Sequence, residues 1–313
     1  MSIRTFLKLV EIQTKLASLF PFAVGLLFVI YKFNELKPLN TIIFFCSMFI
    51  FDLTTTAINN YMDYKKASSK EYRNEKNIIG IKAIPERLVR NTIITLLAIA
   101  TMLGIWLVWR TDITVLFIGI LCFAIGIFYT YGPIPLSRMP LGELFSGVTM
   151  GLGITFLTVY INAFDKGIVN FFFNGAISTV QVNYMSLIEI IWISLPCVFT
   201  IANVMLANNI CDLEEDVINK RYTLPYYIGK RNAIILFNIL YIASFIAIIT
   251  AVLFKVLPVM MLFSLLVILP VYQHCRKFKG KQVKAETFVL AVKNLVLVNG
   301  SFVTMMILAL LIV

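Results

Sequence analysis

Two short stretches of the sequence place oxygen-bearing side chains at spacings that suit a metal ion. The first reads NNYMD over residues 59–63, and the second reads NNICDLEED over residues 208–216. Both begin with Asn-Asn-x-x-Asp, and both stand where an apolar run meets charged residues. On a helix, Asn208, Asp212 and Asp216 fall at i, i+4 and i+8, so they share one face. Carboxylates this close repel one another unless a cation lies between them.

Mg²⁺ is the cation that this pattern favours, because it binds hard oxygen ligands, usually one or two carboxylates plus substrate phosphates. A metal held in this way neutralises a departing diphosphate. Two matched copies of the motif indicate two half-sites that face each other. The alternative is that these acids are solvated helix ends. We predict the metal ligands to be Asn59, Asp63, Asp212 and Asp216.

Basic and amide side chains beside the two motifs are candidates for binding a diphosphate. The alternative for each basic residue is the positively charged flank that membrane helices commonly carry. We assign the following residues to substrate binding: Asn60, Lys65, Lys66, Arg73, Arg138, Asn208, Asn209, Lys220 and Arg221.

A turn over residues 129–138 lies between two apolar runs and ends with Arg138. Its glycine and prolines force a tight turn, and Tyr129 and Tyr131 are placed to stack on a carbocation or an aromatic ring. An interfacial aromatic belt would explain the tyrosines but not the Gly-Pro-x-Pro turn. Asp52 lies two helical turns before Asn59 on the same face. It is a candidate to accept a proton or bind a phenolic hydroxyl, and the alternative is a hydrogen bond between helices.

The composition is that of a polytopic helical membrane protein. The chain has 313 residues, of which 60% are hydrophobic, and its mean hydropathy is +0.89. We interpret the net charge of +11 as positive loops rather than as a nucleic-acid-binding surface. A single His and five scattered Cys argue against a zinc, haem or disulfide site. We expect one all-α domain, residues 1–313, with pseudo-repeated halves at roughly 1–140 and 141–313.

Nine apolar runs have about the ~20 residues that a membrane span requires. They cover residues 16–33, 40–60, 90–109, 113–131, 142–161, 186–207, 233–254, 257–273 and 288–313. A further segment, 162–185, is rich in Phe, Asn and Gly, and we interpret it as an interfacial cap.

The distribution of Lys and Arg predicts the orientation in the membrane. Of the 27 basic residues, Lys293 lies inside the last run and 21 lie on the side of the N-terminus. The other side has only Lys32, Lys37, Arg110, Lys166 and Lys255. The positive-inside rule therefore places the N-terminus and both Asn-Asn-x-x-Asp motifs in the cytoplasm and the C-terminus outside.

With these motifs the chain resembles the UbiA superfamily of intramembrane aromatic prenyltransferases, over its whole length. That family has two Asp-rich motifs, and the second is intact here as Asp212-x-x-x-Asp216. The run from Lys220 to Gly229 and the turn that continues into Leu141-Gly142-Glu143 resemble the branch that prenylates 1,4-dihydroxy-2-naphthoate. The first motif departs from the family, because Asn60 stands where an Asp is usual.

The resemblance implies about nine helices around a central cavity that opens sideways to lipid, in the cell membrane. It implies Mg²⁺-dependent transfer of a polyprenyl group from its diphosphate to 1,4-dihydroxy-2-naphthoate, with loss of CO₂ and diphosphate, to give demethylmenaquinol. Other acceptors in the family are 4-hydroxybenzoate, haem, chlorophyllide and homogentisate. A membrane transporter is the alternative from another class, but its key charges would be expected near the midplane.

Labelling with an impermeant thiol reagent tests the orientation. In a background without the five native Cys, single Cys at Ser69 and at Lys230 should react only after the cells are opened. A Cys at Lys166 should react in intact cells, because we predict it on the outside. Labelling of Ser69 and Lys230 from opposite sides would mean that the two half-sites cannot meet.

Overall fold

The computed structural model describes residues 1–67, 71–131, 135–174 and 177–312. All nine predicted apolar runs are helical over these residues. The helices that carry them are α2 (Leu16–Phe33), α3 (Pro38–Lys66), α5 (Glu86–Arg110), α6 (Ile113–Phe128), α7 (Gly142–Ser146) with the π-helical η4 (Gly147–Gly153) and α8 (Ile154–Ala163), α9 (Tyr184–Cys211), α11 (Leu224–Leu253), the 3-10 helix η6 (Val259–Val267) with α12 (Ile268–Gly280), and α13 (Phe288–Ile312).

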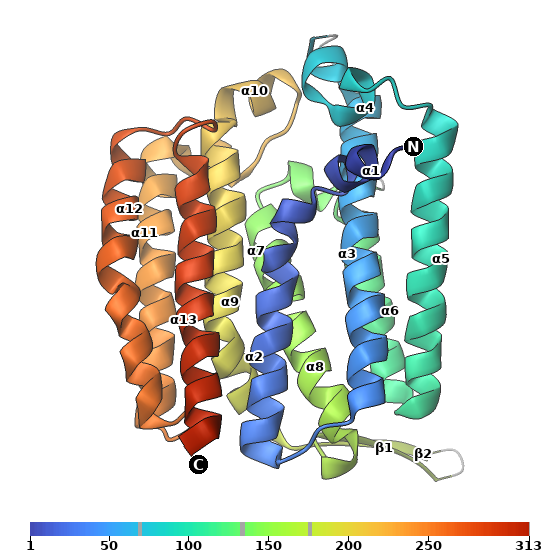
Figure 1. The fold of residues 1–313 in the computed structure, drawn as a ribbon, viewed down its shortest axis with the longest axis vertical. Helices are drawn as coiled ribbons and strands as arrows, with labels where there is room; N and C mark the ends of the chain where they lie inside the picture. The colour runs from blue at the N-terminus through green and yellow to red at the C-terminus, as the bar shows by residue number, and fades with distance from the viewer. Residues whose placement is uncertain (68–70, 132–134, 175–176, 313) are drawn as a thin grey trace.

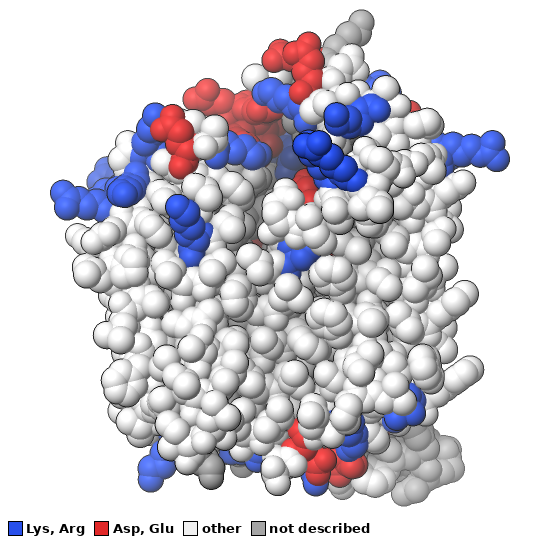
Figure 2. All heavy atoms as spheres, viewed as in Figure 1, with Lys and Arg blue, Asp and Glu red and all other residues white. Residues whose placement is uncertain are grey.

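Eight of these helical segments in the described residues are long and apolar enough to cross a membrane, and α6 is a shorter apolar helix of 16 residues. Charged side chains gather at the two ends of the molecule and leave an uncharged band between them (Figure 2). The N-terminus lies at one end of the bundle and the C-terminus at the other (Figure 1). This pattern is that of a helical bundle immersed in a bilayer.

Helix α9 lies in the middle of the bundle and packs against α11, α13, α2 and η4. Buried polar side chains join it to its neighbours, because an unpaired polar group in an apolar interior is costly. The amide of Asn299 on α13 donates to Thr200 Oγ1 on α9 over 2.8 Å. Thr155 Oγ1 on α8 donates to the carbonyl of Pro21 on α2 over 3.2 Å. These bonds fix the long helices at their midpoints.

Short elements cover the two ends of the bundle. At the end that carries both Asn-Asn-x-x-Asp motifs lie α1 (Ile3–Leu9), η1 (Ile12–Lys15), η2 (Tyr72–Lys76), α4 (Ile78–Ile81), η3 (Leu136–Arg138) and α10 (Leu213–Ile218) (Figure 1). At the opposite end, within the predicted cap 162–185, lie η5 (Phe164–Lys166) and an antiparallel hairpin. Its strands are β1 (Val169–Asn174) and β2 (Ile177–Val182). The hairpin is the part of the fold that an all-α prediction leaves out.

Gly147 and Gly151 allow η4 to approach α9 closely. A Cβ on Gly151 would lie 2.6 Å from the backbone of Val198, and a Cβ on Gly147 would lie 2.7 Å from the carbonyl oxygen of Val198. Both distances are too short for any side chain. The close contact holds α7, which follows the turn of residues 129–138, against α9, which carries the second motif.

Gly151→Ala should therefore lower stability by about 1–3 kcal/mol, the usual cost of overpacking a core. Thermal unfolding of the purified protein in detergent measures the effect. Gly153→Ala is the matched control, because its Cβ would lie at ordinary contact distances, 3.5 Å from Cys122 Sγ and 3.9 Å from Val148 O. The control should be neutral or slightly stabilising, since Ala favours a helix over Gly. Equal losses in the two variants would contradict the role of the Val198 contact.

Candidate active site

The two motifs lie on different helices that end at the same side of the bundle. Asn59 and Asp63 are in the last turns of α3. The predicted single helix through Asn208, Asp212 and Asp216 is wrong, because α9 ends at Cys211 and α10 begins at Leu213. Asp212 lies at the break, with φ −96° and ψ 6°. Its N–H still donates to Asn208 O (3.0 Å), and the N–H of Asp216 donates to Asp212 O (2.8 Å), so the one-turn spacing is kept.

Arg221 joins the first motif to the second. Its Nη1 lies 3.7 Å from Asp63 Oδ2, and its Nε lies 3.4 Å from Asp216 Oδ1. Lys220 has φ 55°, which reverses the chain after α10 and turns Arg221 inward. Arg138 Nη2 approaches the other oxygen of Asp63 at 3.6 Å. Residues that are far apart in the sequence thus form one charged cluster.

Asp216 lies in a buried position where its negative charge is only partly compensated. Its side chain is 6% exposed, and Oδ2 has no hydrogen-bond partner. Burial, together with the negative charge of Asp212, raises the pKa of Asp216 to about 6, against the opposing effect of Arg221. A carboxylate in such a place is stabilised by additional positive charge.

The oxygen atoms around Asp216 fit a hard divalent cation such as Mg²⁺. Asp216 Oδ2 and Asn219 Oδ1 are buried without a partner, and both residues line the same cavity. Among the described residues, no group of three His, Cys, Asp or Glu side chains forms a metal cluster. The amide oxygens of the two motifs and the substrate phosphates would therefore have to complete the coordination, as is usual for Mg²⁺.

Two lysines reach the same end of the cavity, and the sequence analysis did not assign either to the site. Lys284, between α12 and α13, donates to Asp212 Oδ2. Lys76 Nζ lies 3.0 Å from Glu215 Oε2 and so joins η2 to α10. Both lysines lie on the positively charged side of the predicted topology, and this was the one sequence feature that could have pointed to them as site residues. Their sequence positions do not say which of the many basic residues turn inward.

A cavity of about 1570 Å³ opens at this cluster and extends into the bundle. It follows α3 from Asp63 to Phe44, which is roughly 28 Å at 1.5 Å per residue. The deep walls are apolar and include Phe44, Met48, Phe51, Leu107, Val108, Val115, Leu157 and Ile201. The mouth is polar and includes Asn59, Asp63, Lys66, Arg138, Asn208, Asp212, Asp216, Arg221 and Lys284. Figure 2 shows the hollow between charged side chains at this end.

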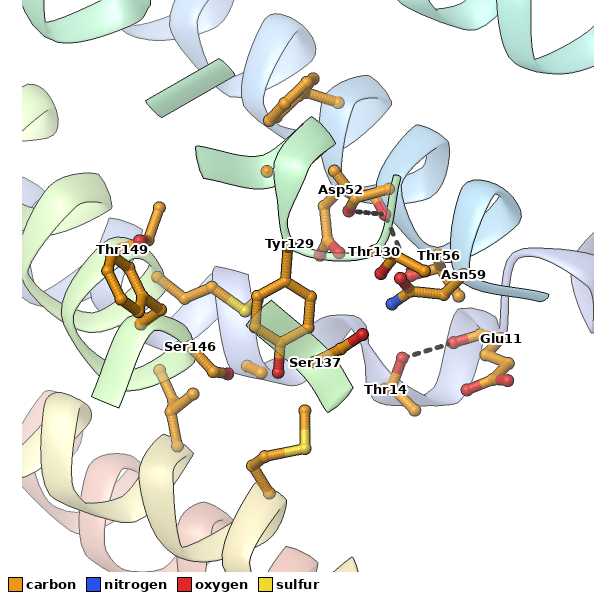
Figure 3. Close-up of a pocket in the computed structure, with 18 of the residues that line it drawn as sticks. Glu11, Thr14, Asp52, Thr56, Asn59, Tyr129, Thr130, Ser137, Ser146 and Thr149 are labelled. Carbon is orange, nitrogen blue, oxygen red and sulfur yellow. Dashed lines mark hydrogen bonds between the residues drawn. The ribbon is translucent and has the colours of Figure 1, made fainter. Parts of the chain in front are cut away.

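A group of hydroxyl side chains surrounds the ring of Tyr129 (Figure 3). They come from four segments of the chain and are Thr14, Thr56, Thr130, Ser137, Ser146 and Thr149. The hydroxyls of Thr130 and Thr149 are buried without a hydrogen-bond partner. The Tyr129 hydroxyl donates to the carbonyl of Gly142 over 3.4 Å. This side of the cavity, which we call the hydroxyl pocket, can therefore hydrogen-bond a small polar ring.

Asp52 lines the cavity, but both of its oxygens are engaged. Lys15 Nζ lies 2.8 Å from Oδ1, and the hydroxyl of Ser18 donates to Oδ2 over 2.7 Å. Lys15 is only 2% exposed, so the pair is enclosed. The structure therefore favours the predicted alternative, a polar contact between helices α2 and α3, over a free proton acceptor.

Several predicted site residues lie away from the cavity in the described part of the chain. Tyr131 and Lys220 are exposed to solvent. Lys65 pairs with Glu86 at 3.2 Å, and Arg73 packs over the ring of Tyr64 at 4.5 Å. Gly132 and Pro133 of the predicted turn lie outside the described residues.

Asn60 and Asn209 have structural partners. The amide of Asn60, which lines the cavity, donates to Leu9 O (3.0 Å) and to Glu11 Oε1 (3.1 Å), and so fixes the N-terminal segment on α3. Asn209 is buried and donates to Glu143 Oε1 over 2.8 Å. The latter bond joins α9 to α7 directly behind the charged cluster. The motif amides thus differ in role: Asn59 and Asn208 line the cavity, and Asn209 holds its wall.

The fold and the site together define a membrane-embedded enzyme with a charged mouth above an apolar cavity. The model of the UbiA prenyltransferase family matches residues 18–300. The chain belongs to the UbiA prenyltransferase family.

The chain is also similar to individual relatives. It is 31% identical over 188 residues to a 1,4-dihydroxy-2-naphthoate octaprenyltransferase of Bacillus subtilis (strain 168). That match covers 59% of this chain and 53% of the relative, so the chain matches about half the length of that protein.

Two solved structures share the fold. The apo structure of a UbiA homologue from Aeropyrum pernix K1 has a TM-score of 0.69 at 16% identity and covers 93% of this chain and 98% of the other. A UbiA homologue from Archaeoglobus fulgidus bound to GPP and Mg²⁺ has a TM-score of 0.65 at 14% identity, with 97% and 98% covered.

The contact between Glu143 and Asn209 can be tested by stability. Glu143→Leu removes the acceptor of the buried Asn209 amide and should destabilise the protein by about 1–3 kcal/mol. Glu143→Gln keeps an acceptor and adds a donor for Asn209 Oδ1, which has no partner, so it should match or exceed the wild type. Thermal unfolding in detergent measures both. Glu189→Gln is the control, because Glu189 pairs with the partly exposed Lys32. A Gln variant as unstable as the Leu variant would contradict this assignment.

Proposed function

We propose that this chain transfers a polyprenyl group from polyprenyl diphosphate to 1,4-dihydroxy-2-naphthoate, with Mg²⁺ as cofactor. The products are demethylmenaquinol, CO₂ and diphosphate. The observation that carries the proposal is the bridge that Arg221 makes between Asp63 and Asp216 at the mouth of the apolar cavity. One end of this cavity suits an anionic head group and the rest suits a long apolar tail.

The residues at the mouth hold the diphosphate of the donor. Arg138, Arg221 and Lys66 supply positive charge, with Arg offering a planar fork that matches phosphate oxygens. Asp63, Asp212 and Asp216, with Asn59 and Asn208, would hold Mg²⁺. The bound ion would neutralise the charge that develops on the leaving diphosphate. The deep apolar walls enclose the isoprenoid tail and keep water away from the reacting carbon.

The hydroxyl pocket holds the acceptor ring beside Tyr129. When the allylic C–O bond breaks, the ring attacks the resulting carbocation, and the aromatic face of Tyr129 stabilises its charge. A new C–C bond forms at the carbon that bears the carboxylate. The C–COO⁻ bond then breaks and returns its electron pair to the ring as CO₂ leaves.

The naphthoate acid loses CO₂ and needs no base, unlike an acceptor that is prenylated at a C–H position. The latter reaction must remove a proton and so needs a base. Asp52, the carboxylate first considered for that task, is engaged by Lys15 and Ser18. The similarity to the Bacillus subtilis naphthoate octaprenyltransferase supports the same choice. We further propose that the site lies on the cytoplasmic side of the cell membrane, as the distribution of Lys and Arg predicts. A water-soluble acid and Mg²⁺ are available there.

A transfer assay on membranes tests the proposal. Membranes with the protein, Mg²⁺, a polyprenyl diphosphate and 1,4-dihydroxy-2-naphthoate should yield demethylmenaquinol by mass, with release of labelled CO₂ from the carboxylate. Parallel reactions with 4-hydroxybenzoate and homogentisate test other acceptors.

Excess chelator should abolish the product, and Asp216→Ala should reduce it by at least about 100-fold, the range for removing one preorganised electrostatic group. Full activity in excess chelator would exclude the metal-dependent mechanism. If product formed only with one of the other acids, 1,4-dihydroxy-2-naphthoate would be excluded as the acceptor.

A further inference from the structure

The connection between α12 and α13, residues 281–287, carries two lysines in different environments. Lys284 lines the cavity and donates to Asp212 Oδ2. Lys281 pairs with Glu286 on the same connection at 2.7 Å. The two side chains are equally exposed, at 55% each. They differ in the carboxylate that each one neutralises.

Lys284 is held less firmly than Arg221, the other cation on the second motif. The Arg221 side chain is 19% exposed and contacts carboxylates from two helices. Its backbone N–H donates to Asp216 O over 2.8 Å, which fixes the residue further. Among the described residues Lys284 forms an ion pair with Asp212 alone, and it has a flexible stem and a compact ammonium group with three rotatable donors. It can therefore change partner at little cost in conformational energy.

The Asp212 carboxylate cannot form full contacts with both Lys284 and a divalent cation. A metal bound to Asp212 Oδ2 takes the oxygen that now accepts from Lys284. Glu215, the neighbouring acid, is already paired with Lys76 at 3.0 Å. Asp216, whose Oδ2 has no hydrogen-bond partner, would be held by the same cation. A diphosphate at the mouth of the cavity would then be the anion left to accept from Lys284.

We propose that Lys284 is a diphosphate-binding residue that exchanges partners, moving from Asp212 to the diphosphate of the prenyl donor when a divalent cation takes Asp212. This inference rests on the proposed function. The exchange keeps Asp212 neutralised before substrate arrives and supplies one more positive charge to the diphosphate once it is bound. The metal and the lysine compete for Asp212 in the absence of donor and act together in its presence.

The proposed exchange predicts that Lys284→Gln raises the affinity for the metal ion and lowers the affinity for the diphosphate. Without donor, the variant should bind Mn²⁺ about threefold more tightly, because removing a partly exposed ion pair frees Asp212. With Mn²⁺ present, it should bind a non-ionising thiolo analogue of farnesyl diphosphate about tenfold more weakly, because one charge-assisted hydrogen bond is lost. Lys284→Arg keeps the positive charge and should change the affinity for Mn²⁺ clearly less than Lys284→Gln does, with the affinity for the analogue within about threefold of the wild type.

Isothermal titration of the full-length protein in lipid nanodiscs gives both affinities. Lys281→Gln is the matched control and should change neither, because neither Lys281 nor its partner Glu286 lines the cavity. Unfolding temperatures of the variants verify that each is folded. Loss of both affinities in Lys284→Gln, a change in only one of them, or no change in either would overturn the exchange. Failure of the wild-type protein to bind the diphosphate analogue with Mn²⁺ would instead overturn the proposed function.

Discussion

The structure depends on holding like charges together at the edge of an apolar interior. Asp63, Asp212 and Asp216 line the mouth of the cavity at the polar end of the bundle. The three carboxylates would separate unless positive groups lay among them, and Arg221 provides the central one by contacting two of them. Arg138 and Lys284 supply the rest. Because each cation comes from a different connection, this electrostatic requirement also determines how those connections fold over the mouth.

The long helices position this cluster because the ends that carry its residues lie at the same side of the bundle. Glycines bring η4 against α9, and buried amides and hydroxyls fix α13 and α8 to their neighbours. The Glu143–Asn209 bond then holds the wall behind the charges. A rigid frame of this kind is needed because a coordination site fails when its ligands shift by about an ångström.

The cavity separates two tasks along its length. The charged mouth suits an anionic group, and the apolar walls deeper in the bundle suit a tail that needs no specific hydrogen bond. The hydroxyl pocket beside Tyr129 lies between these regions, where a reacting ring would meet both. The enclosed Lys15–Asp52 pair adds polarity there without net charge. An acceptor bound there, as we propose, would be positioned by hydrogen bonding rather than by attraction to a free ion.

The sequence by itself determined the membrane class, the nine helical runs and the two acidic motifs, because apolar run length and residue spacing are local properties. It assigned both basic residues after the second motif, Lys220 and Arg221, to substrate binding, whereas the structure places Arg221 against the acids and leaves Lys220 exposed. It could not separate Arg221 from Lys220, since only the left-handed turn at Lys220 decides which of the two faces inward. In the same way it could not find Lys284, or show that Lys15 engages Asp52, because these contacts join segments far apart in the chain. Burial and partner choice are set by how the helices pack, so only the tertiary structure decided which charges form the site.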